Sequence, residues 1–319
     1  MARRLAVAGT TLAVGLTAAI APVSAQTQLG GVVGRVTKHA DTAIGTVALG
    51  VGAGGSVANS FGPLLWGGGP VQHSPAVYID FWGWNGSDPT GEAAYLQSFF
   101  NGVGGSGWAN IQTQYTDGSG AVGNPTGQLK GVWFNNTTSP STSPSDADVA
   151  AQALVAAAHF GYSADADYFI ATPSGHSDPG FAGAGGSYCA YHASIADSSS
   201  RPVAFTNFPY QTDAGTSCGM NSVNAGSAGT LDGVSIVGGH EYAETVTDPQ
   251  PDLGYVDAAL QETGDKCAWI SIGFGASQDI TLSTGTFAVQ TLWSNNADTA
   301  GVPQTGSTLG YGECVISYP

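Results

Sequence analysis

The chain has 319 residues, with 7 Lys and Arg against 23 Asp and Glu and a formal net charge of −16. So acidic a protein is not expected to bind nucleic acids or anionic membranes, because both carry negative charge. The 48 glycines and 42% hydrophobic residues, with only 9% charged ones, describe a compact, loop-rich domain. They exclude a disordered chain, which would be poor in apolar residues.

The N-terminus has the pattern of an export signal. Arg3 and Arg4 precede an apolar stretch that runs to about Pro22, and small residues follow up to Ala25. Glycines and threonines interrupt the stretch and no basic flank follows it, which disfavours a transmembrane anchor. Residues 1–25 are therefore predicted to be a signal peptide. Its removal leaves a secreted protein, extracellular or associated with a cell wall, with a net charge of about −18 because both arginines are lost.

The mature chain is expected to have three parts. Residues 26–60 are mainly Gly, Ala, Val and Thr without a clear period, and are expected to be a flexible leader or pro-segment. An α/β domain with some α+β character should follow over residues 61–248, and a small β-rich subdomain over residues 249–319.

Strand and helix patterns alternate along residues 61–248, which predicts a mixed sheet with helices. The predicted strands cover 76–82, 129–134, 168–171 and 203–208, and the predicted helices cover 88–100, 145–160 and 231–246. Residues 172–232 are otherwise expected to be mostly loop. Three short strands are predicted in the C-terminal subdomain, at 268–272, 280–282 and 287–292.

Four cysteines are expected to form two disulfides, since the chain is exported and no CxxC pair suggests a zinc knuckle or a redox site. Three connectivities are possible. Pairing of neighbours in the sequence, Cys189 with Cys218 and Cys267 with Cys314, is favoured because it respects the two halves of the chain.

The helix predicted over residues 231–246 carries the strongest chemical signal, the sequence HEYAE from His240 to Glu244. Side chains four positions apart share one helix face, so His240 and Glu244 can bind one ion, while Glu241, about 100° around the axis, reaches a ligand beside it. This is the geometry of a HExxH zinc site whose second imidazole is replaced by a carboxylate. The alternative is a simple hydrogen-bonded His–Glu pair.

A zinc site of this kind also needs a third protein ligand and an open position for water. Asp265, two residues before Cys267, is the first candidate and Glu262 the second; alternatively, Asp265 only forms an Asx turn. His192 lies beside another cysteine and is a candidate ligand, a donor to a developing oxyanion, or a structural histidine bonded to the backbone. Glu241 is then the general base.

Two segments resemble the phosphate-induced protein 1 family, to which plant EXORDIUM proteins belong. HEYAE followed by Asp248-Pro249 is similar to the family's His-Glu-Leu-Ala-Glu helix with Asn-Pro or Asp-Pro after it. ETGDKC at residues 262–267 is similar to its Glu-Ile-x-Asp-x-Cys segment. Tyr242 and Thr263 replace the family's leucine and isoleucine, which removes no candidate ligand.

Weaker similarities to the family occur at GPLL, residues 62–65, and at YCAYH, residues 188–192. The resemblance covers roughly residues 61–315. It implies an extracellular or wall-associated protein with a zincin-like core.

These features predict a secreted zinc-dependent metallopeptidase acting on proteins or peptides. The expected ligands are His240, Glu244 and Asp265, with Glu241 as general base and His192 as oxyanion stabiliser. One alternative is a non-catalytic secreted protein of the wall or matrix, with a structural metal site. Another is a metal-independent acid hydrolase built on paired carboxylates.

Overall fold

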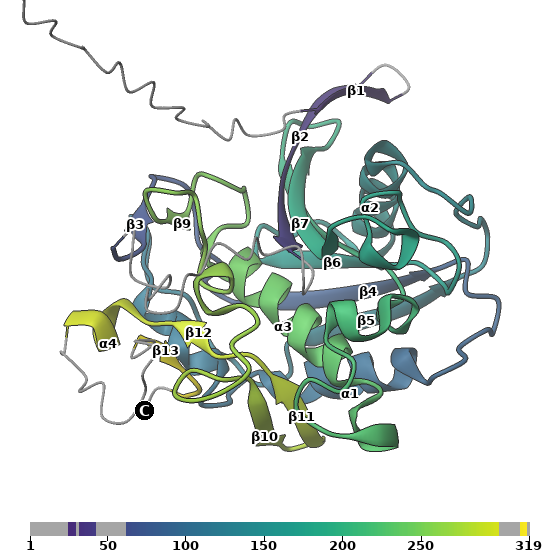
Figure 1. Ribbon diagram of the computed structural model, residues 1–319. Helices are drawn as coiled ribbons and strands as arrows, with labels where there is room; N and C mark the ends of the chain where they lie inside the picture. Colours follow the sequence, from purple (N-terminus) through teal and green to yellow (C-terminus); the bar gives the residue numbers. More distant parts are fainter. Residues whose placement is uncertain (1–24, 30–31, 43–61, 300–312, 318–319) are drawn as a thin grey trace, which may run out of the picture.

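The computed structural model describes residues 25–29, 32–42, 62–299 and 313–317. In these ranges the chain has mixed α/β architecture, with a central sheet between helices and three small two-stranded sheets around it (Figure 1). The expected fold class is therefore confirmed.

The strands of the central sheet lie in the order β1-β2-β7-β8-β6-β4-β5. Neighbours among β5, β4, β6 and β8 are parallel, whereas β7, β2 and β1 are added by antiparallel pairing. The strands are β1 Ala25–Leu29, β2 Val32–Thr42, β4 Ala76–Trp82, β5 Leu129–Asn135, β6 Ala166–Ala171, β7 Tyr188–Ala196 and β8 Pro202–Phe208.

Helices cover both faces of the sheet, with α2 on one side and α1 and α3 on the other (Figure 1). The α-helices are α1 Glu92–Val103, α2 Asp146–Phe160, α3 Asp232–Thr247 and α4 Asn295–Thr299. The 3-10 helices are η1 Ala109–Gln114, η2 Ala182–Ala184, η3 Gln211–Cys218, η4 Gly226–Gly229 and η5 Asp265–Cys267. The small sheets pair β3 Leu65–Trp66 with β9 Tyr255–Val256, β10 Gln278–Leu282 with β11 Gly285–Val289, and β12 Leu292–Trp293 with β13 Cys314–Val315.

Local capping explains where the first two helices begin. Ser145 and Asp148 form a capping box at α2, each side chain accepting the other's backbone N–H. The helix predicted from residue 88 begins only at Glu92, because the Asp88 carboxylate accepts the backbone N–H groups of Gly91, Glu92 and Ala93 from outside the helix.

Three sequence expectations for strands are wrong. Residues 172–232 contain the nine-residue strand β7, which is nearly all buried and so lacks the alternation typical of a half-buried strand. Residues 268–272 form turns rather than a strand, with a positive φ of 56° at Trp269. The strand predicted over 287–292 is divided between β11 and β12, with Gln290 and Thr291 between them.

β1 and β2 lie, apart from Ala25, within residues 26–60, the segment expected to be a flexible leader or pro-segment. β2 pairs antiparallel with β7, and His39 lies opposite His192 in the register. Without β2, the backbone N–H and C=O groups along that edge of β7 would lack a strand partner, which gives β2 a physical reason to be ordered. The pro-segment role stays a prediction, and the predicted signal peptide lies outside the described residues except for Ala25.

Both predicted disulfides are confirmed. Cys189–Cys218 joins β7 to η3 with a Cα–Cα distance of 5.5 Å, and Cys267–Cys314 joins η5 to β13 with 5.6 Å. No helix within the described ranges is long and apolar enough to cross a membrane.

The α3 helix is the centre of the core, since every residue in it is buried. As expected from its two adjacent glycines, other segments pack closely there. A Cβ atom on Gly239 would lie 3.1 Å from the Trp108 ring and 3.3 Å from the Phe99 ring, and one on Gly238 would lie 3.2 Å from Leu96. The absence of these Cβ atoms lets α1 and the start of η1 lie against α3.

The C-terminal strands pack on the same core. Ser235 of α3 donates a hydrogen bond to the Ala288 carbonyl of β11 at 2.6 Å, and Phe287, Val289 and Trp293 belong to the hydrophobic cluster that includes the sheet. A division of the chain between residues 248 and 249 stays a prediction.

We expect Gly239→Val to destabilise the fold by about 1–3 kcal/mol, because two methyl groups would be forced against Trp108 and Phe99. Urea unfolding of the variant measures this loss. Ala158→Val, at an exposed position of α2, is the control for the cost of a β-branched residue in a helix. Equal stability of the two variants would contradict the close packing of α3.

Candidate metal centre

The HEYAE segment lies in the second half of α3, where His240, Glu241 and Glu244 are completely buried. β7 supplies His192 to the same place, the loop before η5 supplies Glu262, and the first residue of η5 is Asp265. Two segments from other parts of the sequence thus meet at one helix.

The predicted ligand set comes together. Nε2 of His240 lies 3.0 Å from Oε1 of Glu244 and 3.8 Å from Oδ1 of Asp265. One donor atom from each of the three residues can be chosen so that all lie within 4.8 Å of one another. The expectation that both carboxylates lie within about 5 Å of His240 is therefore met. Whether the set binds zinc stays a prediction.

Gln290 orients the His240 ring. Its side-chain Nε2 donates a hydrogen bond to the Gly264 carbonyl at 2.8 Å, which directs Oε1 toward Nδ1 of His240 at 3.1 Å. Because Oε1 can only accept, Nδ1 carries the proton in this bond, and the lone pair of the neutral ring is left on Nε2. That nitrogen faces Glu244 and Asp265. A polar partner behind the ring is typical of metal-binding histidines.

The loop before η5 is tied to the helix by its backbone. Glu262 donates its N–H to Oδ2 of Asp265 at 3.1 Å, and Asp265 donates its own N–H to Oε1 of Glu244 at 3.0 Å. One oxygen of Asp265 thus closes a turn while the other faces His240. A turn role and a ligand role are compatible in this residue.

Only glycine fits at position 264. A Cβ atom there would lie 2.7 Å from Nδ1 of His240 and 2.9 Å from Oε1 of Glu244. The loop can therefore approach the candidate ligands closely only because Gly264 has no side chain.

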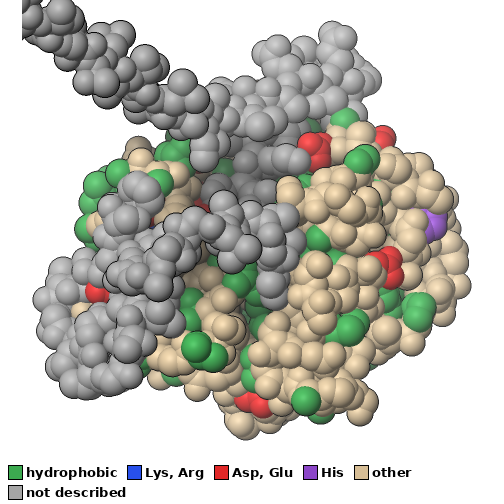
Figure 2. Space-filling view, in the orientation of Figure 1, with side chains coloured by type: hydrophobic (Ala, Val, Ile, Leu, Met, Phe, Trp, Pro, Cys, Tyr) green, Lys and Arg blue, Asp and Glu red, His purple; other side chains and the backbone are tan. Residues whose placement is uncertain are grey.

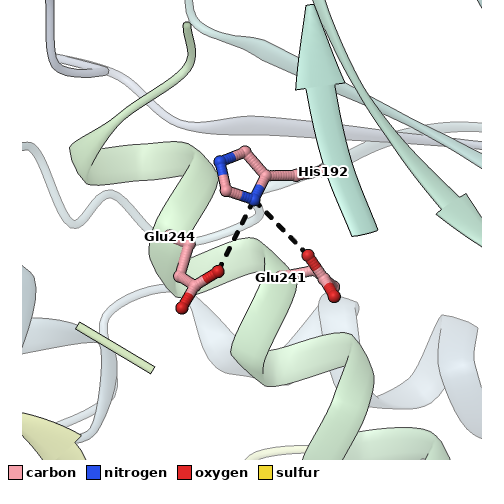
Figure 3. Close-up of side chains that lie close together, drawn as sticks. All are labelled: His192, Glu241 and Glu244. Atoms are coloured by element: carbon pink, nitrogen blue, oxygen red, sulfur yellow. Dashed lines mark ion pairs between the residues drawn. The ribbon is translucent and has the colours of Figure 1, made fainter. Parts of the chain in front are cut away.

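His192 lies above α3 with its ring among carboxylates (Figure 3). Its Nδ1 is 3.5 Å from Oε2 of Glu241 and 3.5 Å from Oε2 of Glu244, and its Nε2 is 3.6 Å from Oε1 of Glu262. The structure thus brings together all five residues predicted for the site, although His192 and Glu241 lie beside the His240 set. The oxyanion role of His192 stays a prediction.

Buried negative charge dominates the electrostatics of the site. Burial raises the pKa of Glu262 well above its usual value, and repulsion from Glu244, Asp248, Asp265 and Glu241 raises it further. Burial also raises the pKa of Asp248 to about 7, although the Gly254 N–H bonded to its carboxylate opposes the shift. A bound cation would offset this repulsion.

The negative charge of the site is not offset by the lysine next to it in the sequence. The nearby ammonium group of Lys266 is engaged elsewhere, 2.9 Å from Oδ2 of Asp257. On the molecular face seen in Figure 2, by contrast, the visible acidic side chains are scattered.

Comparison of the chain with models of protein families, with curated proteins and with solved structures finds no match. The resemblance to the phosphate-induced protein 1 family therefore stays a prediction that rests on the motifs at residues 240–249 and 262–267.

Sequence reasoning missed Gln290 and Gly264. Gln290 had a usable signal, since it is a polar residue in the otherwise apolar stretch FAVQTLW, and a buried polar side chain must find a partner. Gly264 had none, because a close approach between loop and helix leaves no mark on the local pattern.

We expect Gly264→Ala to weaken zinc binding by about 10–100-fold, because the added methyl group displaces His240 and Glu244. Calorimetric titration of the metal-free protein with zinc measures the change. Gly118→Ala is the control, since a Cβ atom there meets no atom within 4 Å. Unchanged affinity in Gly264→Ala would show that zinc binds elsewhere.

Proposed function

We propose that this protein is a secreted zinc-dependent metallopeptidase. The observation that carries the proposal is the convergence of one imidazole nitrogen and two carboxylate oxygens, from His240, Glu244 and Asp265, with a further glutamate next to His240 on the same helix. Secretion is supported by the signal-like N-terminus and by the two disulfides, which persist in oxidising compartments.

The donor set suits zinc. Catalytic zinc sites use three protein ligands drawn from imidazole nitrogen, carboxylate oxygen and thiolate sulfur, and keep one position for water. Here a neutral imidazole and two carboxylates would balance the charge of a divalent ion. The Gln290 amide would keep the nitrogen lone pair of His240 directed at the ion.

When bound, a zinc ion would polarise the scissile carbonyl and lower the pKa of a water toward neutrality. Glu241 takes the proton of that water and returns it to the leaving amine. His192, whose Nδ1 lies 3.5 Å from the Glu241 carboxylate, holds this base in place and is the candidate donor to the developing oxyanion.

One observation favours a second candidate function. His192, His240, Glu241 and Glu244 are all 0% exposed, as in a closed structural site. A non-catalytic wall- or matrix-associated protein could use such an ion as a brace. For catalysis, part of the chain must move aside to admit a peptide.

Glu241→Gln tests the mechanism. The amide keeps the size of the side chain but cannot accept a proton, so we expect the tightly bound zinc to be retained while peptide hydrolysis falls by about 10²-fold or more. Glu244→Gln should instead lose the zinc, because a neutral amide is a much poorer ligand. Metal analysis and hydrolysis of a peptide library measure both effects.

Glu92→Gln is the matched control, since Glu92 is also buried but accepts hydrogen bonds from the backbone of residues 211 and 212. It should keep both zinc and activity. A wild-type protein that binds no transition metal would refute the zinc mechanism. One that binds zinc but cleaves no peptide, before or after removal of residues 26–60, would favour the structural brace.

A further inference from the structure

We infer that the cluster holds a second metal site, formed by His192, Glu241 and Glu244, and that a second zinc ion bound there inhibits the enzyme. Binding of the second ion depends only on these residues. Its inhibitory effect rests on the proposed function, because it acts through the general base.

The geometry of the second set is as compact as that of the first. One donor atom each from His192, Glu241 and Glu244 can be chosen within 4.8 Å of one another. Nδ1 of His192 lies 3.5 Å from an oxygen of each glutamate, and both carboxylates point toward the ring (Figure 3). An imidazole and two carboxylates are again a zinc-like donor set.

Glu244 serves both sets through different oxygens. Its Oε1 faces His240 at 3.0 Å, whereas its Oε2 faces His192 at 3.5 Å. A carboxylate that presents one oxygen to each of two imidazoles is placed to bridge two ions, an arrangement that two-metal sites use. The two sets can therefore be filled together.

The two imidazoles have different partners behind the ring. Behind His240 stands the Gln290 amide, and behind His192 stands the Glu262 carboxylate, 3.6 Å from Nε2. A neutral imidazole has a proton on one ring nitrogen and a lone pair on the other, and a zinc ion binds the nitrogen that has the lone pair. In His192 the nitrogen that would bind the second ion is Nδ1, which faces Glu241 and Glu244.

The charge of the cluster also favours a second cation. Glu241, Glu244, Glu262 and Asp265 all face one of the two histidines, and the first three are completely buried. Even without Glu262, one divalent ion offsets only two of the three remaining carboxylates. Buried charges need compensation, since their desolvation is costly.

Occupation of the second site has a direct chemical consequence. The ion would bind the carboxylate of Glu241, whose Oε2 faces His192, and its positive charge would make that carboxylate a weaker base for the attacking water. The first equivalent of zinc is expected to activate the enzyme and the second to inhibit it. The zinc concentration outside the cell would then control the activity.

The test is a zinc titration of the metal-free full chain, with the bound metal measured directly after removal of excess ion. We expect about two zinc ions per wild-type chain and about one in His192→Ala. His159→Ala, an exposed histidine on α2, is the control and should bind about two. If His192→Ala does not fold in thermal unfolding, His192→Gln replaces it.

Each outcome separates the hypotheses. One ion in both the wild type and His192→Ala overturns the second site and leaves the proposed function intact. Two ions in both overturn the assignment to His192. Two ions in the wild type and one in the variant support the second site, and the absence of peptide hydrolysis at one zinc ion per wild-type chain refutes the peptidase. Inhibition is refuted if the two-zinc protein is as active as the one-zinc protein, and supported if its activity is at least about 10-fold lower.

Discussion

Burial of acidic side chains around α3 is the constraint on which the rest of this structure depends. An ionised carboxylate without water requires hydrogen bonds or opposite charge, and the cost of leaving it without them exceeds most single packing gains. Each segment that reaches this part of α3 accordingly brings a polar group: His192 from β7, the backbone amide of Asp265, and Gln290 between β11 and β12.

The two disulfides lie next to this cluster in the sequence. Cys189 precedes His192 by three residues on β7, and Cys267 follows Asp265 by two residues in η5. By joining these segments to η3 and β13, the disulfides restrict the movement of two groups that contact the Glu244 carboxylate. Such restriction is what a metal centre requires, because ligands must be held near their binding geometry without the ion.

Glycines also make this centre possible, because they let other segments lie close to α3. Gly238 and Gly239 cost roughly 1 kcal/mol each within a helix, compared with alanine, yet they allow Leu96, Phe99 and Trp108 to pack against α3. Gly264 does the same for the loop on the ligand side. The helix that carries the candidate ligands is therefore held by close packing at Gly238, Gly239 and Gly264. The strand that carries His192 is paired with β2, where His39 lies opposite His192 in the register.

The sequence by itself determined what depends on neighbours along the chain. Helix rules that act along the chain give the start of α2 at Ser145, the end of α3 before Asp248-Pro249 and the common face of His240 and Glu244. The mixed α/β class was also predictable from alternating patterns, and the disulfide pairing was favoured because neighbours in the sequence lie in the same half of the chain. Only the tertiary structure decided which segments meet. β7 was not recognised in the sequence because both of its faces are buried, which removes the alternation typical of a strand. The contacts of His192 with Glu241 and of Gln290 with His240 span about 50 residues, so they depend on packing and strand register, which local spacing does not encode.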